Sequence, residues 1–200
     1  MNIVERVKGI LTNPKREWEI INGEDATPTS LLTSYVIPLL LIGTAAGFVG
    51  YGLIGVDFGF GIKIKGINWG LYQAISYFAG GIISFFVSTY VIDALATNFK
   101  SEKNINKSAQ LVAYSSTAFW VVAILMLLPA LGILMILGLY SIYLFVIGIT
   151  TMKKTPEDQK VVYIIVSALV MIVVSLVISY ILQKILMGVF GLSMGNVLGM

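Results

Sequence analysis

The longest uncharged stretch of the chain covers residues 108–152, between Lys107 and Lys153. As a single helix this stretch would extend roughly 68 Å at ~1.5 Å per residue, more than twice the ~30 Å apolar thickness of a bilayer. It therefore has to fold back on itself. Pro129 and Gly132 stand near its middle, and this pair of helix breakers predicts a very short turn between two membrane-spanning helices.

Composition places the whole chain among integral membrane proteins. It is 58% apolar and 12% charged, whereas charged residues make up about 25% of a typical soluble domain. The central hairpin supplies two predicted spans, 109–128 and 130–152, and further uncharged stretches predict spans at 31–54, 71–92 and 161–182. We therefore expect an all-α integral membrane protein with five transmembrane helices.

The predicted chain has three parts. Residues 1–30 form a short amphipathic helical segment, residues 31–182 the five-span membrane domain, and residues 183–200 an apolar tail on the membrane surface. The apolar residues of the first helix share one face: Ile3, Val4, Val7, Ile10 and Leu11. Because Arg6 and its charged neighbours fall elsewhere, we expect this helix either at the membrane surface or packed under the bundle.

Helix starts and breaks give further local predictions. Proline follows a potential N-cap residue at Asn13, Thr27 and Thr155, which predicts that a helix begins at each of these positions. Pro38 is expected to kink the first span. The glycine-rich stretch 55–70 has apolar residues in alternation, which fits a small hairpin or an interfacial loop.

Small residues recur along two of the spans. Gly43 and Gly47 lie one helical turn apart in the first span. A longer stripe follows the second span: Ser76, Gly80, Ser84 and Ser88. Such stripes let two helix backbones approach closely, and this is the interpretation that we favour. The alternative is that the longer stripe lines a polar path.

The basic residues indicate the orientation in the membrane. With five spans, the 13 Lys and Arg residues all fall on one side of the membrane except for Lys63, Lys65 and Lys184. Lys and Arg concentrate in the cytoplasmic loops of membrane proteins. The N-terminus is therefore predicted in the cytoplasm and the C-terminus outside, in a plasma or bacterial inner membrane.

The candidate functional residues are Asp93, Gln110, Tyr114, Pro129 and Tyr140. Asp93 directly adjoins the end of the second span, where it either reaches water or Lys100 as a structural contact or serves as an ion site. Tyr140 lies deep in the fourth span, so its hydroxyl group requires a partner or a cavity.

Five segments occur in order between Asp93 and Tyr163: Asp-Ala-Leu-Ala-Thr-Asn-Phe, Asn-Lys-Ser-Ala-Gln-Leu-Val-Ala-Tyr-Ser-Ser-Thr, Pro-Ala-Leu-Gly, Tyr-Ser-Ile-Tyr-Leu and Met-Lys-Lys-Thr-Pro-Glu-Asp-Gln-Lys. In order and spacing they resemble the bacterial branch of the Yip domain family. Members often carry proline at the position of Ala118, and glycines at those of Lys100 and Ser101. The resemblance implies a five-helix membrane domain with a cytoplasmic N-terminus. In eukaryotes the family is associated with Rab-type GTPases, but the Asp-Leu-Tyr-Gly-Pro motif of those relatives is missing here.

Composition also excludes several kinds of chemistry. The chain has no His and no Cys, so it cannot build Ser-His-Asp or Cys-His catalytic sites or thiolate metal sites. It also lacks a Gly-x-x-x-x-Gly-Lys phosphate-binding loop. We therefore expect no enzymatic activity and no cofactor. Nucleic-acid binding is not expected either, because membrane topology already explains the scattered basic residues.

Two functions remain. We favour a non-enzymatic scaffold or adaptor whose partners are membrane lipids and other membrane proteins or copies of the same chain. The alternative is a small transporter or channel for an ion or small solute, with a path past Asp93, Gln110, Tyr114 and Tyr140. Transporters usually place charges or broken helices near the membrane midplane, and no charged residue lies deep in a predicted span.

Overall fold

A computed structural model describes residues 2–57 and 63–192, and nearly all of them are helical. Within these residues, five helical segments are long and apolar enough to cross a membrane: Pro28–Ile54, Ile67–Phe99, Ile105–Leu127, Pro129–Lys153 and Glu157–Val189. The all-α class and the number of spans predicted from the sequence are therefore confirmed. The break between the third and fourth spans falls at Leu128, directly before Pro129.

The elements follow one another along the chain with short connections. Two short helices come first: α1 (Ile3–Thr12) and α2 (Pro14–Asn22). The first span consists of α3 (Pro28–Leu31), η1 (Leu32–Val36), α4 (Ile37–Gly47) and η2 (Phe48–Ile54). A strand pair, β1 (Val56–Asp57) and β2 (Lys63–Ile64), leads to the second span, α5 (Ile67–Ala96) and η3 (Thr97–Phe99). The third span has α6 (Ile105–Ser115), α7 (Thr117–Val122) and η4 (Ala123–Leu127), the fourth η5 (Pro129–Leu139) and α8 (Tyr140–Lys153), and the fifth α9 (Glu157–Val189).

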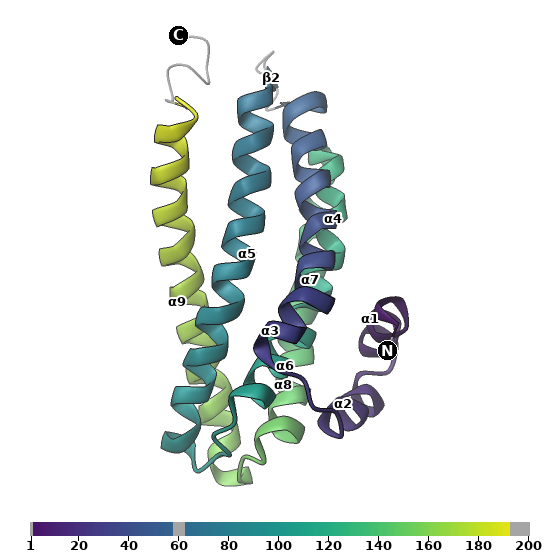
Figure 1. Ribbon diagram of the computed structural model, residues 1–200, viewed down its shortest axis with the longest axis vertical. Coiled ribbons are helices and arrows are strands. Elements are labelled where there is room, and N and C mark those ends of the chain that lie inside the picture. The colour runs from purple at the N-terminus through teal and green to yellow at the C-terminus, as the bar shows by residue number, and fades with distance from the viewer. Residues whose placement is uncertain (1, 58–62, 193–200) are drawn as a thin grey trace.

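The spans form a bundle in which α5 packs between α4 and α9 (Figure 1). Loops 97–104 and 154–156 lie together at the lower end in this view, and the β-strands and the last turns of α9 lie at the upper end. We call the lower end the polar end, because the loops there and the helix ends next to them carry most of the charged side chains of the membrane domain. α9 is nearly straight and continues to Val189, so residues 183–189 belong to the last helix rather than to a surface tail. Residues 193–200 of the predicted tail lie outside the described residues.

The two N-terminal helices pack against the side of the bundle (Figure 1). Trp18 of α2 is fully buried, and it fits so closely against Gly148 of α8 that a Cβ atom there would lie 2.5 Å from the Trp18 ring. The structure therefore shows the N-terminal helices packed against the bundle rather than lying free on the membrane surface. The predicted face of α1 was partly wrong: Val4 is 69% exposed, and Arg6 is fully buried in its place.

The predicted helix starts are confirmed with one correction. Thr27 forms a capping box with Ser30, and Pro14 stands in the first turn of α2. At the start of α9, however, Pro156 itself occupies the cap position. The Thr155 side chain instead accepts a hydrogen bond from Ser101 at 2.9 Å, because loops 97–104 and 154–156 meet at the polar end.

The glycine-rich segment after the first span forms a small antiparallel hairpin. Val56 pairs with Ile64 and Asp57 with Lys63. The hairpin alternative of the sequence prediction is thus confirmed for these strands. The alternating residues Phe58, Phe60 and Ile62 lie outside the described residues, and the end of the predicted stretch, from Ile67 onward, belongs to α5.

Several spans depart from regular α-helix. The first span carries two π-helical segments, η1 just before Pro38 and η2 at its end. The Ser34 carbonyl, which Pro38 cannot bond because it lacks an N–H group, lies within η1. The third span is interrupted at Ser116, just before Ala118, and it ends in 3₁₀ helix. Lys100 has a φ angle of 53°, in the left-handed region that favours glycine. Members of the family that the sequence resembles often carry glycine at the position of Lys100.

Glycines bring the helix backbones of the first two spans and the third span into close contact. Gly43 and Gly47, the small-residue pair of the first span, lie against the side chains of Tyr77 and Met126 rather than against a helix backbone. At Gly50 a Cβ atom would lie 1.8 Å from the Met126 carbonyl oxygen, and at Gly70 2.7 Å from the Gly52 Cα atom. These contacts leave no room for a side chain.

We expect Gly50→Ala to destabilise the bundle. The added methyl group meets main-chain atoms of Met126, which cannot rotate away, so the free energy of unfolding should fall by about 1–3 kcal/mol. Gly132→Ala is the matched control, because a Cβ atom added there would have no other atom within 4 Å. Thermal unfolding of both variants in detergent checks the prediction, and equal midpoints for the two would contradict it.

Candidate functional site

Asp93 belongs to a buried polar cluster at the polar end. Its carboxylate oxygen lies 3.5 Å from the Lys153 ammonium group and accepts a hydrogen bond from Ser108 at 3.1 Å. Lys153 also donates to the Ser108 hydroxyl at 2.8 Å. Lys153 is fully buried and Asp93 is 8% exposed. The cluster joins α5, α6 and α8, so three spans are fastened at this end by one set of contacts.

The partner of Asp93 is not the one predicted. Lys100 carries a left-handed backbone in the loop after η3, and it is exposed. Lys153 takes its place because α8 lies beside α6 and brings its last turn over Asp93. A neighbouring contact extends the cluster to α9: Tyr163 donates a hydrogen bond to the Ile92 carbonyl at 2.8 Å.

Arg6 of α1 forms a second buried charge cluster. Its guanidinium group donates to Glu17 at 2.6 Å and to Glu24 at 2.6 Å. The same group stands over the Tyr114 ring, 5.2 Å from the ring centroid. The rings of Tyr114 and Tyr35 meet edge-on, with their centroids 4.8 Å apart. Tyr114 therefore joins the N-terminal helices to the first and third spans.

Gln110 and Lys107 bind the end of α2. The Lys107 ammonium group donates to the Asn22 carbonyl at 2.6 Å, and the Gln110 side chain donates to the Glu24 carbonyl at 3.0 Å. The last carbonyls of a helix lack partners within the helix and carry partial negative charge. Lys107 satisfies the Asn22 carbonyl and the Gln110 amide also reaches the Ile21 carbonyl, so both side chains make structural contacts with the end of α2.

Tyr140 and Pro129 lie apart from these clusters. The Tyr140 hydroxyl donates to the Leu11 carbonyl of α1 at 3.2 Å, which supplies the partner that its depth in the span required. Pro129 begins η5 at the opposite end of the bundle. The structure thus brings Asp93, Gln110 and Tyr114 to the polar end, and leaves the other two predicted residues elsewhere.

Sequence reasoning missed the basic partners of both clusters, Arg6 and Lys153. Arg6 is one helical turn from both Ile3 and Ile10, so its position on the buried face was readable from the helical period. Lys153 offers no such signal. Lys154 follows it directly, and only one of the two is buried.

A further ion pair lies at the surface of the polar end. Lys154 and Glu102 are 2.9 Å apart, with 73% and 40% of their side chains exposed. The hydrogen bond and the charge of Lys154 lower the pKa of Glu102. A carboxylate with a lowered pKa stabilises the fold above its unfolded-state pKa and loses that contribution as pH falls. Solvent screening keeps the contribution small.

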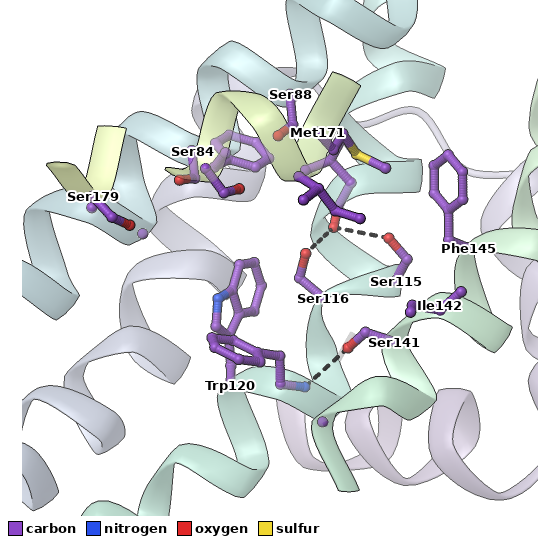
Figure 2. A pocket seen from close by; sticks show the side chains of 18 of the residues that line it. Ser84, Ser88, Ser115, Ser116, Trp120, Ser141, Ile142, Phe145, Met171 and Ser179 are labelled. Atoms are coloured by element: carbon purple, nitrogen blue, oxygen red, sulfur yellow. Dashed lines mark hydrogen bonds between the residues drawn. The ribbon is translucent and has the colours of Figure 1, made fainter. Parts of the chain in front are cut away.

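A cavity of about 830 Å³ opens in the middle of the bundle. Figure 2 shows Ser84 and Ser88 of α5 and Met171 of α9 on one side, with Trp120 and Ser116 from the third span on another. Residues of η5 and α8, including Ser141 and Ile142, complete the wall. The serine stripe of the second span therefore lines a cavity, although Gly80 also contacts Leu182 of α9 as a packing stripe would.

Some of the hydroxyl groups in this cavity are bonded to the backbone, whereas the buried oxygens of Ser76 and Tyr77 have no hydrogen-bond partner among the described residues. Ser115 and Ser116 both donate to the Val112 carbonyl, at 3.3 and 2.8 Å (Figure 2). Ser141 accepts a hydrogen bond from the Phe119 amide at 3.0 Å, next to the interruption of the third span. None of the described residues that line the cavity is charged. In the described ranges, no three His, Cys, Asp or Glu residues gather as a metal site would require.

Comparison with known proteins identifies the family. The family model of the Yip1 domain matches residues 8–179, which cover the second N-terminal helix and nearly all of the five spans. The chain belongs to the Yip1 domain family. This Yip-family chain is also similar to the inner membrane protein YohC of Escherichia coli strain K12, with 25% identity over 162 residues that cover 78% of this chain and 83% of that protein.

The YohC protein of Escherichia coli O6:H1 has the same identity and coverage. No solved structure matches the chain. Together with the five apolar spans, the inner-membrane relatives make this Yip-family chain a multi-pass inner membrane protein whose apolar helices contact lipid.

We expect the loss of one partner to lower the free energy of unfolding much more in the buried ion pair than in the exposed one. Lys153→Met leaves the buried Asp93 carboxylate without its cation, at a cost of about 3–5 kcal/mol in the free energy of unfolding. Asp93→Asn leaves the fully buried Lys153 ammonium group with an amide oxygen in place of its counter-charge, so it should also cost about 3–5 kcal/mol. In the double variant the costs should be less than additive, because the unpaired charge is gone.

Lys154→Met and Glu102→Gln provide the matched control for this cycle. Their side chains are exposed, so each should change the free energy of unfolding by less than about 1 kcal/mol. Chemical unfolding in mild detergent measures all five variants. Additive costs for Asp93 and Lys153 would show that the two side chains are not coupled.

Proposed function

We propose that this Yip-family protein is a non-enzymatic membrane scaffold or adaptor that binds lipid or other membrane proteins. One observation carries the proposal: the charged side chains buried at the polar end are paired with one another. Asp93 is paired with Lys153, and the buried Arg6 is paired with Glu17 and with the partly exposed Glu24. Charges used in this way fix the positions of helices and offer no free site for an ion.

The paired charges hold a defined surface at the polar end. α1 and α2 are fastened there to the third and fourth spans through Arg6, Trp18 and Lys107. A partner protein would therefore meet a preformed arrangement of helices. Other membrane proteins, or further copies of this chain, are the partners that such a surface fits, and binding to a preformed surface costs little ordering entropy.

A small transporter or channel is the second candidate. The cavity in the middle of the bundle favours it, as do the π and 3₁₀ segments of the first, third and fourth spans. Irregular backbone within a membrane usually lines a cavity or a site. The uncharged lining weighs against it, because ion paths through membranes generally carry charged side chains.

The proposed orientation places the N-terminus and the polar end in the cytoplasm and the C-terminus outside. A fluorescent reporter fused after Lys154 should fold and emit in the cytoplasm. Alkaline phosphatase fused at Met200 should be active, because that enzyme requires the oxidising outer compartment. A dark fluorescent reporter after Lys154 together with inactive alkaline phosphatase at Met200, in fusions that still insert into the membrane, would reverse the proposed orientation.

The scaffold proposal predicts no transport. Purified protein in liposomes should show no proton or potassium flux above that of empty vesicles. Asp93→Asn and Tyr140→Phe should both fold, since each keeps most of the local packing. A reproducible flux that Asp93→Asn abolishes in a folded variant would favour the transporter instead.

A further inference from the structure

The central cavity lies at the level of the membrane interior. Its α5 residues run from Ser76 to Ser88 and its α9 residues from Ala168 to Ser179. Both stretches are near the middle of their spans, Ile67–Phe99 and Glu157–Val189. We propose that this cavity binds an acyl chain of a membrane lipid, which enters from the side between α9 and the fourth span.

The side opening is marked by lining residues that are exposed. On the fourth span Ile136, Leu139 and Ile142 line the cavity and are 61%, 59% and 52% exposed. On α9 Ile172 and Leu176 line it and are 53% and 65% exposed. Because all five belong to membrane spans, what lies outside this opening is lipid rather than water.

The inner wall is closed and mostly apolar, although the buried serines Ser88 and Ser115 also belong to it. Leu40, Phe85 and Val112 line it and are almost completely buried. Trp120 and Phe145 complete this wall and are 5% and 4% exposed. A groove with a buried apolar back and an opening into lipid has the shape that an acyl chain fills.

The chemistry of the lining selects a chain over a headgroup. A phosphate or ammonium group at this depth would need an opposite charge, and the described lining residues carry none. The lining does offer hydroxyl groups: Ser115 and Ser116 already donate to the Val112 carbonyl, whereas the buried Ser76 and Tyr77 oxygens have no partner among the described residues. These groups are uncharged, so they do not supply the opposite charge that a headgroup needs. The volume of about 830 Å³ is within the ~300–1,000 Å³ of pockets that bury most of a small ligand.

Trp120 provides the probe. Its ring lines the cavity and is 5% exposed, so an acyl-chain quencher reaches it only from within the cavity. The protein with Trp18→Phe and Trp69→Phe is reconstituted in phosphatidylcholine vesicles whose chains carry bromine at their middle. We expect a loss of Trp120 emission relative to vesicles without bromine.

Filling the cavity should abolish this quenching. Ser84→Phe and Ser88→Phe place a ring inside it, whereas Ser34→Phe, the matched control, adds the same ring on an exposed face of the first span. Quenching should be lost in the first two variants and kept in the third. The proposal would be overturned if bromine left Trp120 emission unchanged. It would also be overturned if bromine quenched this emission equally in all three variants.

A second measurement does not depend on the tryptophan substitutions. Wild-type protein in vesicles of phosphatidylcholine with a photoreactive acyl chain should crosslink at peptides containing Ser84 and Met171, both in the lining. Crosslinks confined to the outward faces of the helices would overturn the proposal. The inference rests on the scaffold function proposed above, and ion flux in the same vesicles separates the two: flux contradicts the scaffold, whereas absent quenching without flux contradicts only the lipid site.

Discussion

Lys153 carries its ammonium group at the end of the fourth span with no exposed surface, and the polar end of the bundle is arranged around it. Removing such a charge from water costs on the order of several kcal/mol, so the fold must supply oxygens in return. Asp93, the Ser108 hydroxyl and the Asn104 carbonyl supply them from α5, α6 and the loop that precedes it. Any shift of one of these helices would leave the charge unpaired, which is why this one contact fixes the relative positions of three spans.

The two halves of the bundle are consequently held in different ways. At the polar end five helices are joined by ion pairs and by side chains that bind the last carbonyls of α2. Arg6 is the buried cation of the N-terminal helices, as Lys153 is of the membrane spans. Toward the opposite end, packing relies on glycine contacts such as Gly50 against Met126, and α9 packs mainly on α5. The cavity opens where α9 and the fourth span diverge. A bundle fastened at one end and open to lipid in its middle agrees with the scaffold function that we propose.

Two of the predictions that failed share one cause. The first helix was oriented by its apolar residues, which placed Val4 inside and Arg6 outside; the helical period also puts Arg6 beside Ile3 and Ile10, and Glu17 and Glu24 neutralise its charge and let it be buried. Asp93 was paired with Lys100, its neighbour in sequence, and the structure gives it Lys153 instead. In each case the deciding group comes from another helix. Local patterns record how apolar a residue is, but they do not record which partner a charge will find.

The sequence by itself determined the number of spans and their turns. A helix that must cross ~30 Å of hydrocarbon has a nearly fixed length, so uncharged stretches and the break at Pro129 were sufficient. It also determined the helix starts at Pro14 and Pro28, because capping depends on adjacent residues. Only the tertiary structure decided that Lys153 rather than Lys100 meets Asp93, and that the serine stripe lines a cavity as well as a packed interface. These outcomes depend on the crossing and spacing of helices far apart in the chain, which residue periodicity does not specify.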